Sequence, residues 1–89
     1  MGRLVITQRV ARELELATVV IYLVRHLNMD WGDLCEEDKE ANAIALESAN
    51  GRLLSRYNTL MADSETRKDV YIITESDRSR TTVLFVDEY

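Results

Sequence analysis

The chain contains no proline and only three glycines among its 89 residues. Proline and glycine are the strongest interrupters of regular structure, so no segment is predicted to link two folding units. A chain of this length normally forms one domain, and we predict a single α+β domain over residues 1–89. Such a domain buries only about 60–65% of the surface of its unfolded chain. Its core must be thin, which disfavours a large enclosed active site.

Local patterns predict a strand, helices, and then three further strands. Thr7 is suited to cap a first helical segment, and Val20, Ile21, Val24 and Leu27 have the spacing of one apolar helix side. The predicted elements are a strand over 4–6, a helical segment after Thr7 that leads into a helix over 19–26, a second helix over 35–50, and strands over 53–57, 70–74 and 81–86. The order β-α-α-β-β-β favours a two-layer fold: an antiparallel sheet of three to four strands with two to three helices on one face.

The helix over 35–50 is predicted to pack on the rest of the fold through small residues. Its expected inner face consists of Ala41, Ile44, Ala45 and Ser48. Gly51 is expected to end it, because glycine adopts the left-handed conformation that commonly follows a helix.

Charge is concentrated in the middle of the chain. The net charge is −5, and residues 30–51 contain seven acidic residues against Lys39 alone. Direct nucleic-acid binding is disfavoured, because it depends on Lys and Arg neutralising phosphates. The single cysteine permits neither an internal disulfide nor a cysteine-based zinc site. No apolar run reaches membrane-spanning length and no signal-peptide core is seen, so we expect a cytoplasmic protein without a membrane partner.

Few residues are suited to catalysis or cofactor binding. A nucleophilic pair of Cys35 with His26 is conceivable, but both residues are better explained as helix-end residues. Asp30 and Asp33 resemble the start of a calcium loop only loosely, since its glycine and terminal glutamate are absent. No phosphate-binding loop, nucleophile elbow or zinc-protease helix occurs. We therefore predict no catalytic residue, metal or cofactor.

Trp31 is the only tryptophan, and it lies between two aspartates. Tryptophan is a frequent anchor in protein interfaces, but it can equally fill a small core. The two interpretations have similar weight, and the burial of the ring decides between them.

Several segments in a constant order resemble a family of small uncharacterised bacterial proteins encoded by plasmids, phages and integrated elements. The family pattern is roughly RHxxGDWG, then RxLSxY, then WIITEADRSxTTVLLPEEY, and the resemblance covers residues 25–89. This chain departs from the pattern at Met29, where glycine is usual, and at Tyr71, where tryptophan is usual. Some members are labelled as restriction-modification subunits, but no methyltransferase motif fits in so short a chain.

The resemblance implies a mobile-element context and a set of polar residues, which we interpret mainly as a structural network. That network comprises Arg25, His26, Asp38, Asn42, Arg52, Ser55, Tyr57, Asp77 and Arg78. Within it, Arg52 is expected to pair with Asp38 and so to hold helix to sheet.

Three functions remain open. The leading hypothesis is a non-enzymatic inhibitor of a host defence nuclease complex, of the anti-CRISPR or anti-restriction type, because an acidic stretch can occupy a basic groove on such a target. Its predicted protein-binding residues are Asp30, Trp31, Asp33, Glu36, Glu37 and Glu40. One alternative is a small hydrolase or transferase using His26 with Asp77 or Glu75. Another is a structural or regulatory homodimer that pairs through an exposed last strand.

Overall fold

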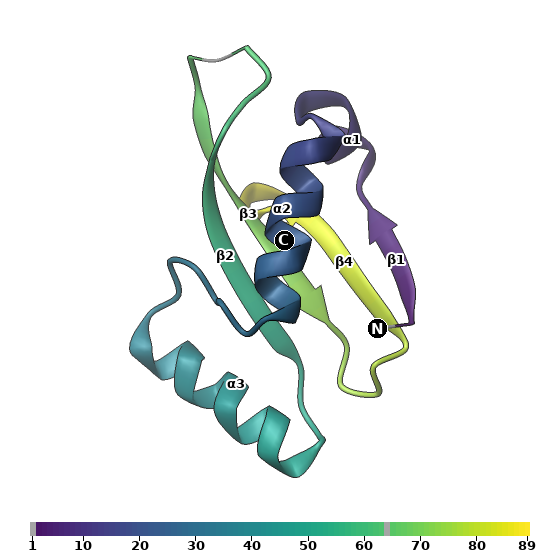
Figure 1. Ribbon diagram of the computed structural model, residues 1–89, viewed down its shortest axis with the longest axis vertical. Helices are drawn as coiled ribbons and strands as arrows, with labels where there is room; N and C mark the ends of the chain where they lie inside the picture. Colours follow the sequence, from purple (N-terminus) through teal and green to yellow (C-terminus); the bar gives the residue numbers. More distant parts are fainter. Residues whose placement is uncertain (1, 64) are drawn as a thin grey trace.

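Alternation of apolar and polar side chains produces a four-stranded sheet, and three helices precede its three long strands (Figure 1). The computed structural model describes residues 2–63 and 65–89. Its elements are β1 (Arg3–Ile6), α1 (Gln8–Glu13), α2 (Leu16–Leu27), α3 (Glu36–Ser48), β2 (Leu53–Leu60), β3 (Arg67–Thr74), β4 (Arg80–Phe85) and the 3-10 turn η1 (Val86–Glu88). The predicted α+β class is confirmed.

The sheet has the strand order β1-β4-β3-β2 and is mixed. Strands β2, β3 and β4 form an antiparallel meander, whereas β1 pairs with β4 in parallel. The prediction of a wholly antiparallel sheet is therefore wrong for this one pair. A short turn forces the meander strands to alternate in direction, but three helices separate β1 from the strands, so no turn sets its direction.

Strand β4, the last in the chain, is an interior strand between β1 and β3. Its backbone pairs on both sides, so it cannot pair with a second copy. The predicted way of pairing, through an exposed last strand, is therefore wrong, and a homodimer as such stays a prediction.

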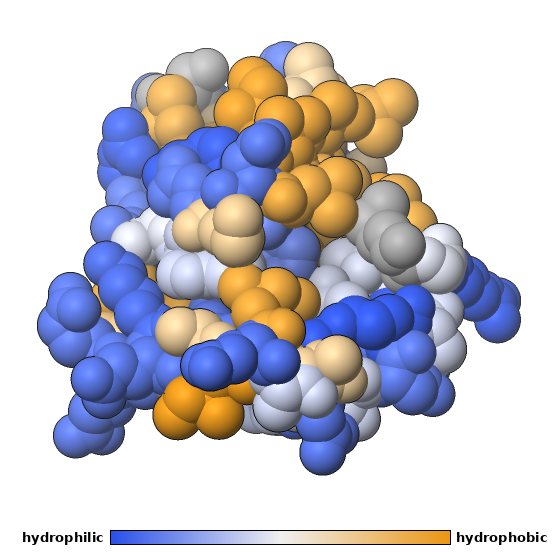
Figure 2. All heavy atoms as spheres, turned by 60° about the horizontal axis from the view of Figure 1, so that its bottom comes forward, coloured by the Kyte–Doolittle hydropathy of each residue, from blue (hydrophilic) through white to orange (hydrophobic). Residues whose placement is uncertain are grey.

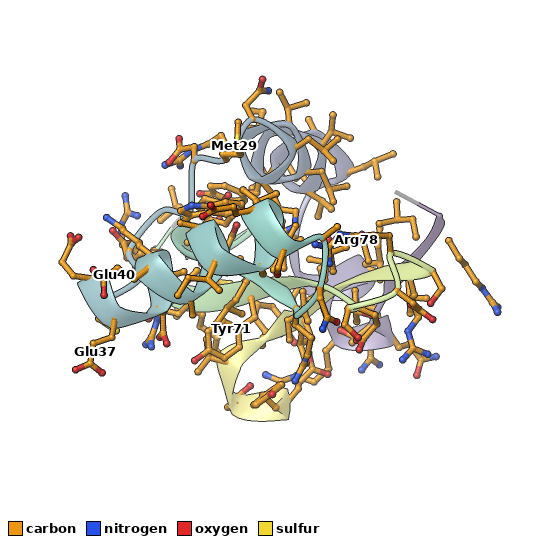
Figure 3. All side chains as sticks on the ribbon, turned by 90° about the horizontal axis from the view of Figure 1, so that it is seen from below. Met29, Glu37, Glu40, Tyr71 and Arg78 are labelled. Atoms are coloured by element: carbon orange, nitrogen blue, oxygen red, sulfur yellow. The ribbon has the colours of Figure 1, made fainter. Side chains whose placement is uncertain are left out.

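One face of the sheet carries the core. Alternate residues of the meander, such as Tyr57, Ile72 and Val83, point to this face and are buried. Helix α2 lies across it (Figures 1 and 3), and α1 contributes the fully buried Val10. Thr7 caps α1 as predicted, accepting a hydrogen bond from the Val10 N–H at 3.3 Å.

Helix α2 buries a different side from the one whose apolar spacing indicated a helix. Val19, Leu23 and His26 face the sheet, while Val20 and Val24 of the predicted apolar side are exposed, as are Ile21 and Leu27. The helix is apolar on nearly every side, so its spacing alone supports two inner faces. The sheet selects the side on which His26 reaches two buried hydroxyl groups.

Helix α3 lies beside the edge strand β2 rather than over the core (Figure 1). Of the four residues predicted to form its inner face, only Ala45 is buried. The other buried residue of α3 is the polar Asn42. The helix ends at Ser48, and Ala49 rather than Gly51 takes the left-handed conformation that follows it, with φ 54°.

Candidate functional site

The segment from Trp31 to Asp33 is held against the free edge of β2. The Arg56 N–H donates to the Trp31 carbonyl at 3.0 Å, and the Asp33 N–H donates to the Arg56 carbonyl at 2.7 Å. Gly32 makes this approach possible, because a Cβ at its position would lie 2.1 Å from the Arg56 carbonyl oxygen. An Asp33 carboxylate oxygen also accepts from the Asn58 N–H at 3.2 Å. The loop therefore covers part of the sheet edge and places Trp31 at a defined position.

Asp30 is occupied by contacts within the chain. Arg25 donates to its carboxylate at 2.7 Å and lowers the pKa of that carboxyl. The Tyr57 hydroxyl donates to the Asp30 carbonyl at 2.5 Å, and the Arg25 guanidinium lies 4.7 Å from the Tyr57 ring centroid. Two of the predicted binding residues, Asp30 and Asp33, thus hold the loop and are also exposed, and their part in binding stays a prediction.

The Trp31 ring is half-buried, so neither interpretation of it holds alone. One side packs edge-on against His26, with ring centroids 5.7 Å apart. It also lines a cleft of about 220 Å³ between the ends of α2 and α3, together with Leu27, Met29 and Leu46. All three of these apolar neighbours are exposed. The ring is anchored in the fold and still available at the surface.

The other predicted binding residues lie on α3. Glu36, Glu37 and Glu40 are exposed, and the labelled Glu37 and Glu40 project outward from the helix (Figure 3). Five acidic residues against one lysine give α3 a charge of −4, which is most of the net charge of the chain. Three of these acids are in the first turn, where the helix dipole favours negative charge. Their only ion pair in the described part of the chain joins Glu36 to Lys39 at 3.7 Å.

The residues of the predicted polar network form several separate hydrogen-bonded groups. The most buried group surrounds His26. Its Nδ1 lies 2.5 Å from the Ser55 hydroxyl, and its Nε2 lies 2.9 Å from the Thr74 hydroxyl. Thr74 in turn bonds the Thr81 hydroxyl at 2.9 Å. Burial lowers the pKa of His26 to about 4, so the ring is neutral at pH 7.

Asn42 and Arg78 join α3 to the sheet. The Asn42 side chain is buried, accepts from the Leu54 N–H at 3.0 Å and donates to the Leu54 carbonyl at 2.7 Å. Its amide group thereby pairs with both backbone polar groups of Leu54, as a neighbouring strand would at this edge of β2. Arg78 donates to the carbonyls of Gly51 at 2.7 Å and Ala45 at 3.3 Å, close to the end of α3.

The expected pair of Arg52 with Asp38 does not form. Arg52 donates to the Tyr89 hydroxyl at 3.0 Å and lies 3.8 Å from Glu75. It lines a cavity of about 210 Å³ together with Asp38 and Asn42 of α3. Asp77 is exposed and accepts the Ser79 N–H at 3.0 Å within a turn. Arg52 and Asp38 thus border one cavity without forming an ion pair, and Asp77 is not part of its lining.

The geometry around His26 does not support a hydrolase or transferase. His26 is only 3% exposed, and hydroxyl groups rather than carboxylates occupy both ring nitrogens. Glu75 instead contacts Arg52 and Arg80. Within residues 2–63 and 65–89, no cluster of three or more His, Cys, Asp or Glu side chains is arranged to hold a metal ion.

One surface was missed by the sequence analysis: the outer side of α2. Its apolar side chains are exposed, and the chain has no charged residue from Leu16 to Val24. A helix that is apolar on all sides is normally covered on all sides. The absence of charge on this apolar helix is the sequence signal that could have pointed to this surface.

Comparisons with known proteins show no matching family model, curated protein or solved structure. No helix within the described residues is long and apolar enough to cross a bilayer.

Proposed function

We propose that this protein is a non-enzymatic protein-binding module that contacts a basic surface through α3 and the Trp31 cleft. We further propose that its partner is a nucleic-acid-processing complex of a host defence system, and that binding inhibits this complex. The resemblance to proteins of plasmids and phages supports this choice of target class. The protein would then act in the cytoplasm as an anti-CRISPR or anti-restriction inhibitor.

The observation that carries the proposal is the unused charge of α3. Helix α3 is attached to the fold through the buried Asn42 and Ala45, so its glutamates are not needed to hold it. Among the described residues, Glu37 and Glu40 take part in no ion pair. A concentrated charge that folding does not use is available to attract a partner of opposite charge.

Trp31 supplies the second part of the contact. A half-buried aromatic ring beside an apolar cleft can be covered by a partner with little loss of conformational freedom, because its packing against His26 already orients it. Long-range charge mainly sets the association rate, whereas a desolvated anchor mainly sets the dissociation rate. The two features therefore predict separable kinetic effects.

Binding kinetics on a purified CRISPR interference complex or restriction endonuclease test the proposal. Glu37→Lys with Glu40→Lys should slow association about tenfold and flatten its dependence on salt. Trp31→Ala should speed dissociation about 30-fold, equivalent to about 2 kcal/mol. Inhibition of nucleic-acid cleavage should weaken in parallel.

A matched control changes the same charge elsewhere. Glu65→Lys with Glu15→Lys alters two exposed acidic residues outside α3 that, like Glu37 and Glu40, form no ion pair among the described residues, and it should leave the association rate nearly unchanged. If both double variants slow association equally, the effect reflects net charge and α3 is not the contact. If a complex forms and neither α3 nor Trp31 variants alter it, the proposed surface is wrong.

A further inference from the structure

The outer side of α2 exposes an unusually large apolar surface. Leu16 is 71% exposed, Val20 48%, Ile21 58%, Val24 51% and Leu27 55%. The side chains of α2 that face away from the sheet are seen at the top of Figure 3. The apolar surface that gathers in the upper part of Figure 2 lies on this side of the molecule. We define these five residues with Ala17 as the outer face of α2. Leu27, at one end of this face, also lines the Trp31 cleft.

This surface is not required by the fold. Val19, Leu23 and His26 attach α2 to the sheet from its other side. Isolated exposed apolar residues are common on soluble proteins, but a continuous apolar patch of several hundred Å² indicates an interaction site. The outer face of α2 is continuous over most of a 12-residue helix.

We propose that a second copy of this chain covers the outer face of α2. The two α2 helices would pack antiparallel about a twofold axis close to Val20 and Ile21. The five large side chains present on the order of 600 Å² per copy, so a pair would bury about 1,200 Å², the lower end for a specific interface. An area of this size predicts a reversible dimer of micromolar affinity rather than an obligate one.

Charge supports this antiparallel arrangement. The outer face contains no charged side chain, so two copies can meet without like charges in contact. Arg25 borders the outer face and is already paired with Asp30 of its own chain at 2.7 Å. Antiparallel pairing about the midpoint of Val20 and Ile21 separates the two Arg25 side chains by about 14 Å along the helices. Parallel pairing would instead place these two like charges side by side.

The size of Ala17 and the state of the β2 edge also favour a contact through α2. Ala17 faces Val24 of the second copy in this register, and a small residue opposite a larger one allows helix axes to approach to about 8–10 Å. Pairing through strand β2 is obstructed, because Asn42 and the Trp31–Asp33 segment already bond its outer edge. A helix contact is therefore favoured over extension of the sheet at β2.

Sedimentation of the purified full chain between about 2 and 400 µM tests the proposal, since that range brackets micromolar affinity. We expect a monomer–dimer equilibrium. Val20→Glu should weaken the dimer by about tenfold or more, because a carboxylate would be buried without a partner. Its melting temperature when monomeric should match the parent, since Val20 is exposed. The control Ile44→Glu changes an exposed apolar residue of α3, 65% exposed, and should leave the dimer intact.

Cysteine cross-linking tests the orientation. In a Cys35→Ser background, which removes the exposed native thiol, Val20→Cys lies near the twofold axis and should form a disulfide-linked dimer under mild oxidation. Leu16→Cys should not, because its counterpart lies at the far end of the contact. A chain that stays monomeric over the whole concentration range overturns the proposal. So does a dimer that Val20→Glu leaves intact, or one in which Leu16→Cys cross-links faster than Val20→Cys.

Discussion

Lowering the pH from about 7.5 to about 5 should destabilise the fold through one residue, His26. It is the only histidine, and burial lowers its pKa from 6.5 to about 4. In the unfolded chain the ring takes up a proton near pH 6.5. Between pH 6.5 and 4 the unfolded state therefore binds a proton that the folded state excludes. The contribution of neutral His26 to the free energy of unfolding is therefore fully present above pH 6.5 and is lost as the pH falls toward 4.

The size of the effect follows from the difference in pKa. A gap of about 2.5 units is worth about 3 kcal/mol when complete, and about 2 kcal/mol of this should be lost by pH 5. For a domain of this size the melting temperature should fall by about 8–16 °C. The carboxyl groups of Asp30 and Asp69 have lowered pKa values, owing to Arg25 in the first case and mainly to Asn58 in the second. They stay ionised in this range and do not contribute.

Urea denaturation at the two pH values measures the loss, with Trp31 fluorescence and far-ultraviolet circular dichroism as probes. His26→Asn is the control, because it removes the titrating ring while keeping a donor and an acceptor near Ser55 and Thr74. The variant should be less stable than the parent at pH 7.5 but nearly independent of pH down to 5. A parent protein whose stability is equal at both pH values would refute the reasoning, as would an equal slope in the variant.

Three further predictions concern the sheet edge and the end of α3, each measured as the free energy of unfolding. Asn42→Ala should cost about 2–3 kcal/mol, because it leaves a backbone N–H and a carbonyl of β2 without partners; a loss below about 0.5 kcal/mol would show that water replaces the amide. Gly32→Ala should cost several kcal/mol or displace the Trp31 loop, because the added methyl group overlaps the Arg56 carbonyl. Ala49→Gly should stabilise by about 1 kcal/mol, since Ala49 has φ 54°. The matched Ala43→Gly, in the exposed interior of α3, should destabilise by a similar amount.

The sequence alone determined the features that depend on neighbouring residues. The α+β class and the three C-terminal strands follow from side-chain alternation, because successive strand residues point to opposite faces. The Thr7 cap likewise follows from a hydroxyl placed three residues before the N–H that it accepts. The acidity of α3 is a property of composition that no fold could remove.

Only the tertiary structure decided which of the available surfaces became interior. Helix α2 is apolar on two sides, and His26 bonding to Ser55 and Thr74 selects the buried one. Asp30 and Glu37 look alike in sequence, yet Arg25 occupies the first and α3 leaves the second at the surface. The choice of the buried side of α2 depends on contacts between residues 29 and 48 positions apart. Periodicity and propensity describe only the near neighbours of a residue, so the choice of buried side belongs to the assembled sheet.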